Sequence, residues 1–144
     1  MKYNKIEKDN LVYSEMFRLA KDVRENAYTP YSQYKVGACV LMKNGKMFTG
    51  CNVENSSYGL TVCAERNAIF KAVSNGYKPG DFKDILIVTD SKDSIATACG
   101  ACRQVIVEFF DSDSRIINAN LEGDYFELSL EELLPFAFTK EDLD

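Results

Sequence analysis

Three cysteines and one glutamate carry the clearest chemical signal in this chain. Cys63, Cys99 and Cys102 form the pattern C-x35-C-x2-C, and Glu65 follows the first cysteine by two residues. Thiolates are preferred zinc ligands, and the two sulfurs of a C-x2-C pair can point the same way from one helical turn. We expect each cysteine-bearing segment to begin a helix, where the positive end of the helix dipole lowers the pKa of a thiol.

Three protein ligands leave one position of a tetrahedral zinc ion open, which is typical of catalytic sites, since structural sites are closed by four ligands. Glu65 is placed to lie beside the ion without binding it, so that its carboxylate can carry protons to and from a water molecule. Histidine is absent, which excludes Ser-His-Asp and Cys-His nucleophile systems. Arg66 and Arg103 are candidates to donate hydrogen bonds to a thiolate and offset its charge.

Other interpretations of these residues remain open. A C-x2-C pair alone is also typical of a redox dithiol, and a structural zinc site would use Cys51 as its fourth ligand. Cys39 and Cys51 are otherwise expected to be small buried residues of strands. The odd count of five cysteines argues against a disulfide framework. Arg103 fits equally well as a solvated or subunit-contact side chain.

The elements that must position these residues alternate along the chain. Helical periodicity marks the segments 10–27, 63–74 and 99–110, and a capping box at Ser129 and Glu132 predicts a short last helix. Strand patterns mark the segments 35–43, 46–52, 85–89, 115–120 and 125–129. This order predicts an α/β fold with a single mixed β-sheet of about five strands sandwiched between helices in three layers. We expect residues 1–144 to form one domain.

Composition limits the classes of partner. The chain has 144 residues, with 17 basic and 22 acidic side chains and a formal net charge of −5. Because its basic residues are scattered, we expect a small-molecule partner and no nucleic acid. The polar N-terminus and the lack of a long apolar run predict no signal peptide, no membrane contact and a cytoplasmic location.

Several motifs together resemble one known family. The similarity lies in CNVENSSYGLTVCAERNAIFKAV, CGACRQVIVEF, YTPYSQYKVGACVL and LEELLPFAF. They resemble the zinc-dependent cytidine deaminases of the small homotetrameric type, within the cytidine/deoxycytidylate deaminase superfamily. The resemblance implies hydrolytic deamination of cytidine and deoxycytidine to uridine and deoxyuridine, with release of ammonia and one zinc ion per subunit. The alternatives are a deaminase of a related nucleoside such as blasticidin S, and a non-catalytic zinc-stabilised interaction domain.

The resemblance also implies roles for individual residues. Cys63, Cys99 and Cys102 match the zinc ligands, and Glu65 matches the proton carrier. The positions that match substrate-binding residues are Tyr34, Asn52, Glu54, Ser56, Tyr58, Ala64 and Phe138. Among them, Asn52 and Glu54 match residues that hold the ribose 3′-hydroxyl, and Ser56, Tyr58 and Phe138 match positions that reach a neighbouring subunit's substrate.

Two further positions bear on the surroundings of the metal. Arg66 and Gln104 match residues that surround the zinc ligands. Ala98 stands where the family usually has proline, and we expect a looser ligand loop there. Without the resemblance, Asn52 and Glu54 would be interpreted as turn residues, and the aromatic side chains as core or interface residues.

Overall fold

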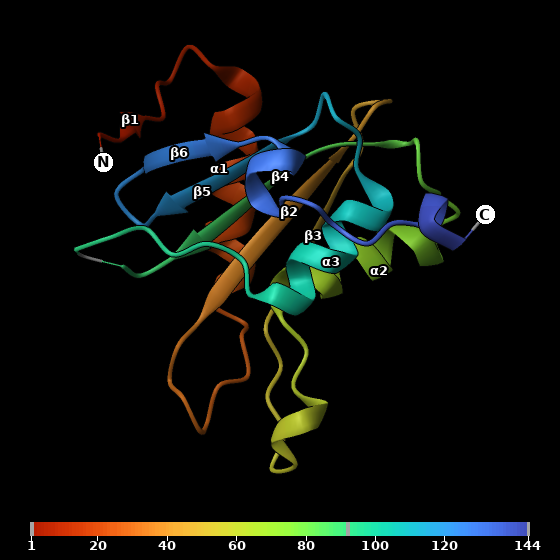
Figure 1. The fold of residues 1–144 in the computed structure, drawn as a ribbon. Helices are drawn as coiled ribbons and strands as arrows, with labels where there is room; N and C mark the ends of the chain where they lie inside the picture. Colours follow the sequence, from red (N-terminus) through yellow and green to blue (C-terminus); the bar gives the residue numbers. More distant parts are fainter. Residues whose placement is uncertain (1, 92, 144) are drawn as a thin grey trace.

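Six strands form one mixed sheet in the computed structural model, which describes residues 2–91 and 93–143 (Figure 1). The strands are β1 (Asn4–Lys5), β2 (Val36–Met42), β3 (Met47–Cys51), β4 (Phe82–Thr89), β5 (Arg115–Asn120) and β6 (Asp124–Leu128). They lie in the order β1-β6-β5-β4-β2-β3, with β4 and β5 parallel and the other neighbouring pairs antiparallel. The predicted α/β fold is confirmed, and β1 adds a sixth strand to the five expected.

Helices cover both faces of the sheet. They are α1 (Leu11–Arg24), α2 (Ala64–Ser74), α3 (Gly100–Phe109) and α4 (Leu130–Leu133), with short 3₁₀ helices at Tyr58–Leu60 and Lys140–Leu143. Figure 1 shows α1 on one face and α2 with α3 on the other, so the three predicted layers are present. No helix in the part of the chain that the structure describes is both long and apolar enough to cross a membrane.

Each face of the sheet has its own apolar core. Met16 and Ala20 of α1 pack against Leu86 and Val88 of β4, because alternate residues of a strand point to opposite faces. Glycine permits the closest contacts on both sides. A Cβ atom on Gly37 would lie 2.0 Å from the carbonyl oxygen of Ala20, and one on Gly50 would lie 2.4 Å from the amide nitrogen of Ala68. The backbones of α1 and α2 therefore lie directly on the sheet.

The strand directions explain why the starts of α2 and α3 meet. β3 and β4 are both antiparallel to β2, and β5 is parallel to β4, so β3, β4 and β5 all run the same way. α2 connects β3 to β4, α3 connects β4 to β5, and both pack on the same face of the sheet. Their N-termini consequently lie at the same end of the sheet, although the cysteines there are far apart in the sequence.

A hairpin-like arm interrupts the connection between β3 and α2. We call residues 53–62 the arm. Its base is fixed by backbone hydrogen bonds in both directions between Val53 and Val62, each of 3.0 Å. Figure 1 shows the arm, in yellow, projecting well away from the sheet and its helices. Tyr58 and Leu60 at its tip are 75% and 66% exposed, and the Tyr58 ring meets the Tyr31 ring edge-on with the centroids 5.8 Å apart, so most of the apolar surface of the arm stays open.

Candidate metal and substrate site

The three cysteine thiols converge where α2 and α3 begin. Cys63 and Cys99 are the N-cap residues of these helices, and neither side chain is used for capping. Cys102 lies in the first turn of α3 and is fully buried. The Sγ atoms of Cys63 and Cys99 are 3.7 Å apart, and all three Sγ atoms lie within 4.8 Å of one another. Tetrahedral coordination with zinc–sulfur bonds of about 2.3 Å requires sulfur–sulfur distances of about 3.8 Å, so this donor set fits one zinc ion.

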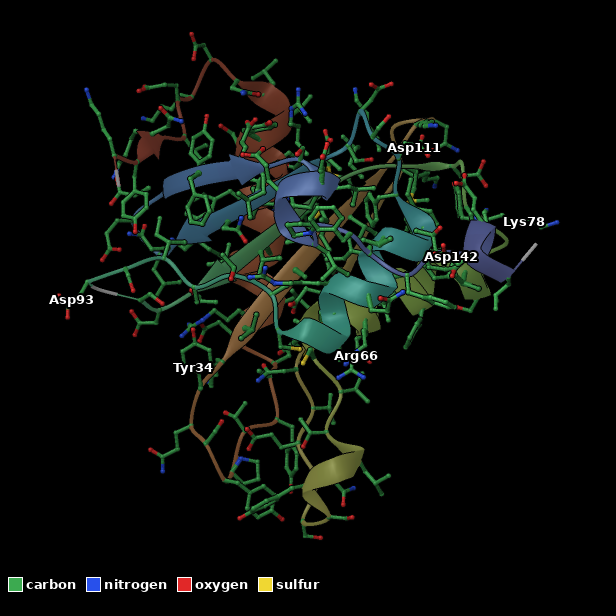
Figure 2. The ribbon with its side chains drawn as sticks, in the orientation of Figure 1. Tyr34, Arg66, Lys78, Asp93, Asp111 and Asp142 are labelled. Atoms are coloured by element: carbon green, nitrogen blue, oxygen red, sulfur yellow. The ribbon has the colours of Figure 1, made fainter. Side chains whose placement is uncertain are left out.

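Arg66 compensates part of the negative charge of these thiols. Its Nη2 donates a hydrogen bond of 3.5 Å to the Sγ of Cys63, as the sequence predicts. Figure 2 shows Arg66 beside the helix starts, where sulfur atoms gather. Hydrogen bonds from Cys102, and then from Arg66 and Cys99, outweigh burial and lower the pKa of Cys63 to about 5. The pKa of Cys102 is raised, first because its thiol donates to Cys63 and then because it is buried.

Glu65 is a buried carboxyl group beside the thiols. It lies in the first turn of α2 and is only 4% exposed. Burial raises its pKa to about 7, and the neighbouring Cys63 thiolate acts in the same direction. Glu65 is not part of the group of converging metal donors. A carboxyl group in this position can both accept and donate a proton near neutral pH.

A cavity of about 260 Å³ opens onto Cys63, Cys99 and Glu65. The predicted site residues on its wall are Tyr34, Asn52, Glu54, Cys63, Ala64, Glu65 and Cys99. Other residues of the wall were not predicted from the sequence, among them Ser32, Ile87, Thr89, Ala96 and Thr97. The sequence held a signal for them, because Thr89 ends a predicted strand and Ala96 and Thr97 lie three and two residues before Cys99, a predicted ligand. Residues at the carboxyl ends of strands commonly form ligand crevices in α/β sheets.

Asn52 and Glu54 organise the loop that forms the outer part of this cavity. The side-chain amide of Asn52 donates to the carbonyl oxygen of Tyr34 at 2.8 Å and accepts from the amide of Val36 at 2.9 Å. The Glu54 carboxylate accepts hydrogen bonds from the hydroxyl of Ser32 and from the amides of Tyr31 and Ser32. The hydrogen bonds from Ser32 and Tyr31 hold the pKa of Glu54 below its usual range.

Three predicted substrate residues lie outside the cavity of their own chain. Ser56 and Tyr58 are exposed on the arm, where Tyr58 borders a second hollow together with Tyr31, Ser32 and Glu54. Phe138 is 59% exposed and lies in the C-terminal segment. It is held there by Gln104, whose Nε2 donates to the Phe138 carbonyl oxygen at 2.8 Å. Gln104 therefore supports the C-terminal segment, and its predicted position around the zinc ligands stays a prediction.

Arg103 does not make the predicted contact with a thiolate among its hydrogen bonds. Its guanidinium group donates to the carbonyl oxygens of Ala98 at 2.8 Å and Leu133 at 2.7 Å, and to the Thr97 hydroxyl at 2.5 Å. It therefore fastens the loop before Cys99 to the end of α4. Three of its N–H donors are used by these oxygen acceptors, and among the described residues none donates to a thiol.

The alternatives for the cysteines receive no support from the geometry. All five cysteines are free thiols, and in the described residues the group of converging donors does not include Cys51. Cys39 is buried, and burial raises its pKa to about 12, which suits an inert core residue. A larger hollow of about 360 Å³ lies at the C-terminal end of α3, but it has no thiol on its wall. Of these two hollows, the smaller one is the one with thiols on its wall.

Comparison with known proteins agrees with this site. Residues 12–117 match the family model described as the cytidine and deoxycytidylate deaminase zinc-binding region. A cytidine deaminase of Halalkalibacterium halodurans is 48% identical over 129 residues, which cover 90% of this chain and 96% of that protein. The crystal structure of cytidine deaminase from Burkholderia pseudomallei has a TM-score of 0.83 at 46% identity and covers 87% of this chain and 98% of its own. A blasticidin-S deaminase of Bacillus cereus is 32% identical over 116 residues, 76% of this chain and 80% of that protein.

Proposed function

Because the chain belongs to the cytidine and deoxycytidylate deaminase family, we propose that it deaminates free cytidine and deoxycytidine to uridine and deoxyuridine, with release of ammonia. The family relationship makes it a hydrolytic cytidine deaminase. The observation that carries the detailed proposal is the cavity in which a buried, non-ligating Glu65 lies beside three converging thiols. Residues 1–144 act in this proposal as one catalytic domain.

Cys63, Cys99 and Cys102 would hold one zinc ion per chain. Zinc in such a site activates a water molecule as a nucleophile near neutral pH. The hydrogen bond from Arg66 to Cys63 withdraws negative charge from the ligand set. Two observations support this assignment. The thiols of Cys63 and Cys99 lie close to each other, and neither side chain is used to cap its helix.

Glu65 supplies the proton transfers of the proposed reaction. Its carboxylate accepts a proton from the attacking water and delivers it to N3 of the pyrimidine ring. It then assists protonation of the departing amine, so that one group acts in turn as base and acid. The burial of Glu65 supports this role, because a proton held there is not exchanged freely with bulk water.

The outer part of the cavity would hold the sugar. Tyr34, Asn52, Glu54 and Ala64 line it, and we assign the ribose 3′-hydroxyl to Asn52 and Glu54. An ionised Glu54 is a good acceptor for a hydroxyl and would repel a 3′-phosphate, so free nucleosides are preferred over nucleotides and polynucleotides. The net charge of −5 acts in the same direction. A cytoplasmic location remains a prediction from the sequence.

We further propose a homotetramer in which neighbouring subunits complete the active sites. Exposed aromatic and aliphatic residues are numerous on the single chain, and those most exposed include Tyr58, Leu60, Phe136, Phe138 and Leu143. Large exposed apolar side chains on a projecting arm, here Tyr58 and Leu60, mark protein–protein contacts. Ser56, Tyr58 and Phe138 would then contact substrate across a subunit boundary, which their positions outside their own cavity support.

The decisive experiment is a nucleoside panel with zinc content measured on the same sample. We expect cytidine and deoxycytidine to lose their absorbance on conversion to uridine and deoxyuridine, with about one zinc ion per chain. Blasticidin S belongs in the panel because one relative carries that name. If blasticidin S is converted and cytidine and deoxycytidine are not, blasticidin S becomes the substrate in their place. A zinc-replete protein inert towards every nucleoside would instead favour a zinc-stabilised interaction domain.

A further inference from the structure

Residues 95–98 form one wall of the cavity and lead directly into a metal ligand. Ala96 and Thr97 line the cavity, and Cys99 follows. Ile95 is 7% exposed and anchors the start of the segment in the protein. None of the four residues is a proline, whose ring would restrict the backbone. Contacts with other elements must therefore restrain this segment.

The two ends of this wall are fastened by side chains from different parts of the chain. At its C-terminal end, Arg103 donates hydrogen bonds to the Ala98 carbonyl oxygen and to the Thr97 hydroxyl. At its N-terminal end, the Ile95 amide donates a hydrogen bond of 3.1 Å to the hydroxyl oxygen of Tyr3. Arg103 lies on the neighbouring α3, whereas Tyr3 comes from the opposite end of the sequence.

Tyr3 is itself held in place by the sheet. The following residues Asn4 and Lys5 form β1, which pairs with β6 at Tyr125 and Asp124. The Tyr3 ring stacks on Phe126 of β6, with the ring centroids 5.9 Å apart and an angle of 25° between the planes. A stacked ring on a paired strand has little freedom left, so its hydroxyl presents an acceptor at low entropic cost.

The segment beyond β1 is fastened as well. The Ile6 amide donates to the Gly123 carbonyl oxygen at 2.9 Å, and the Ile6 side chain packs against the core on the α1 face. Lys5 forms an exposed ion pair of 3.3 Å with Asp124. The N-terminal segment is therefore a docked part of the fold that reaches from the β6 edge to the loop beside the cavity.

We propose that Tyr3 is a positioning residue for the active site, because its hydroxyl fixes the amide of Ile95 and with it the cavity wall formed by Ala96 and Thr97. The inference rests on the proposed function, since it assigns that wall to nucleoside binding. It gives the N-terminal strand a role in substrate affinity, although the strand contributes no residue to the cavity.

The expected effect is on KM rather than on kcat. Cys63 and Glu65 are held by α2, and Cys102 by α3, independently of Tyr3. The wall contacts the substrate in the ground state and the transition state alike, and loss of such uniform binding raises KM with kcat unchanged. Loss of one neutral hydrogen bond to a backbone amide corresponds to a change in KM of roughly 3- to 10-fold.

The test uses Tyr3→Phe, which keeps the ring and its stacking but removes the acceptor oxygen. We expect KM for cytidine to rise about 3- to 10-fold, with kcat within about 2-fold of the wild type and unchanged zinc content. Phe126→Leu, which removes the stacking partner and leaves the hydroxyl, is expected to shift KM in the same direction by less. Lys5→Ala, on the same strand, is the matched control and is expected to leave KM unchanged.

Amide hydrogen exchange at Ile95, measured without nucleoside, is the second readout. We expect faster exchange there in Tyr3→Phe and wild-type exchange in Lys5→Ala. An unchanged KM in Tyr3→Phe, or a raised KM with unaltered exchange at Ile95, would overturn the proposal. If the wild-type protein deaminates no nucleoside, the proposed function fails, whereas exchange at Ile95 still decides whether Tyr3 restrains the wall.

Discussion

The two ends of the cavity are built in different ways. At the inner end, Cys102 and Ala64 are fully buried and Glu65 is 4% exposed, and all three lie on helices packed against the sheet. At the outer end, Tyr34 is 42% exposed, and Tyr58 on the arm outside the cavity is 75% exposed; the loop and the arm project at the bottom of Figure 2. The fold thus completes the reacting end within one chain. The end that we assign to the sugar depends on loop contacts and, in our proposal, on a second subunit.

The largest effect is expected at the inner end, from Glu65→Gln. This change keeps the size of the side chain but removes its ability to carry a proton, and a residue used for several transfers lies at the top of the range for general acid–base groups. We therefore expect kcat to fall by about 10⁴-fold, with zinc retained because the three thiols are intact. Steady-state kinetics with metal analysis checks both points, and Glu108→Gln on the exposed face of α3 is the control. Near-normal turnover in a zinc-replete variant would refute the proposed mechanism.

Glu54→Gln tests the outer end and is expected to act on KM. A hydrogen bond between the charged carboxylate and the ribose 3′-hydroxyl would be lost, which corresponds to a rise in KM of roughly 10- to 100-fold. The check is to repeat the kinetics with 3′-deoxycytidine. The wild type and the variant should differ little on that substrate, since it lacks the hydroxyl.

Glu54 also holds the backbone of Tyr31 and Ser32, so a structural effect must be separated from a binding effect. A loop that has merely loosened would weaken both substrates equally. An equal penalty on cytidine and 3′-deoxycytidine would therefore remove Glu54 from the sugar contact and leave it as a support for the loop.

Elements that follow from local sequence patterns could be predicted, whereas those that depend on contacts with distant segments could not. The five expected strands and the main helices follow from local periodicity, and the meeting of Cys63 with Cys99 follows from parallel crossovers that local patterns already imply. β1 was missed because Asn4 and Lys5 show no periodicity. Its existence depends on pairing with β6 and on the stacking of Tyr3 with Phe126, which are contacts across almost the whole chain.

Arg103 illustrates the same limit at the site. Its position directly after Cys102 suggested a contact with a thiolate, but its acceptors include the Leu133 carbonyl oxygen, which the tertiary fold alone brings near. The partner of Gln104, the backbone of Phe138, was not predictable for the same reason. Residue types near a metal are predictable from a motif, whereas the direction of long polar side chains depends on acceptors supplied by distant segments.

Phe138→Ala tests whether a neighbouring chain completes the outer end. Loss of an aromatic contact with the base corresponds to a rise in KM of about 5- to 10-fold, with little change in kcat because the inner end is untouched. Phe136→Ala, two residues away and fully exposed, is the matched control and is expected to stay within about 2-fold. Light scattering and activity measured across the same dilution series link the effect to assembly. A fully active monomer would contradict the shared site.

The smallest effect is expected at the inner end from Ala98→Pro. The Ala98 carbonyl oxygen is already held by Arg103, while the Ala98 amide donates no hydrogen bond among the described residues. A proline there loses no native donor and reduces the freedom of the unfolded chain, which stabilises by about 0.4–1 kcal/mol. For a chain of this size that raises Tm by about 1–4 °C, and thermal unfolding of the zinc-loaded protein measures it. Since the reacting end is already rigid, KM and kcat should stay within about 2-fold. A lower Tm would mean that the native loop needs a backbone angle at Ala98 that proline cannot adopt.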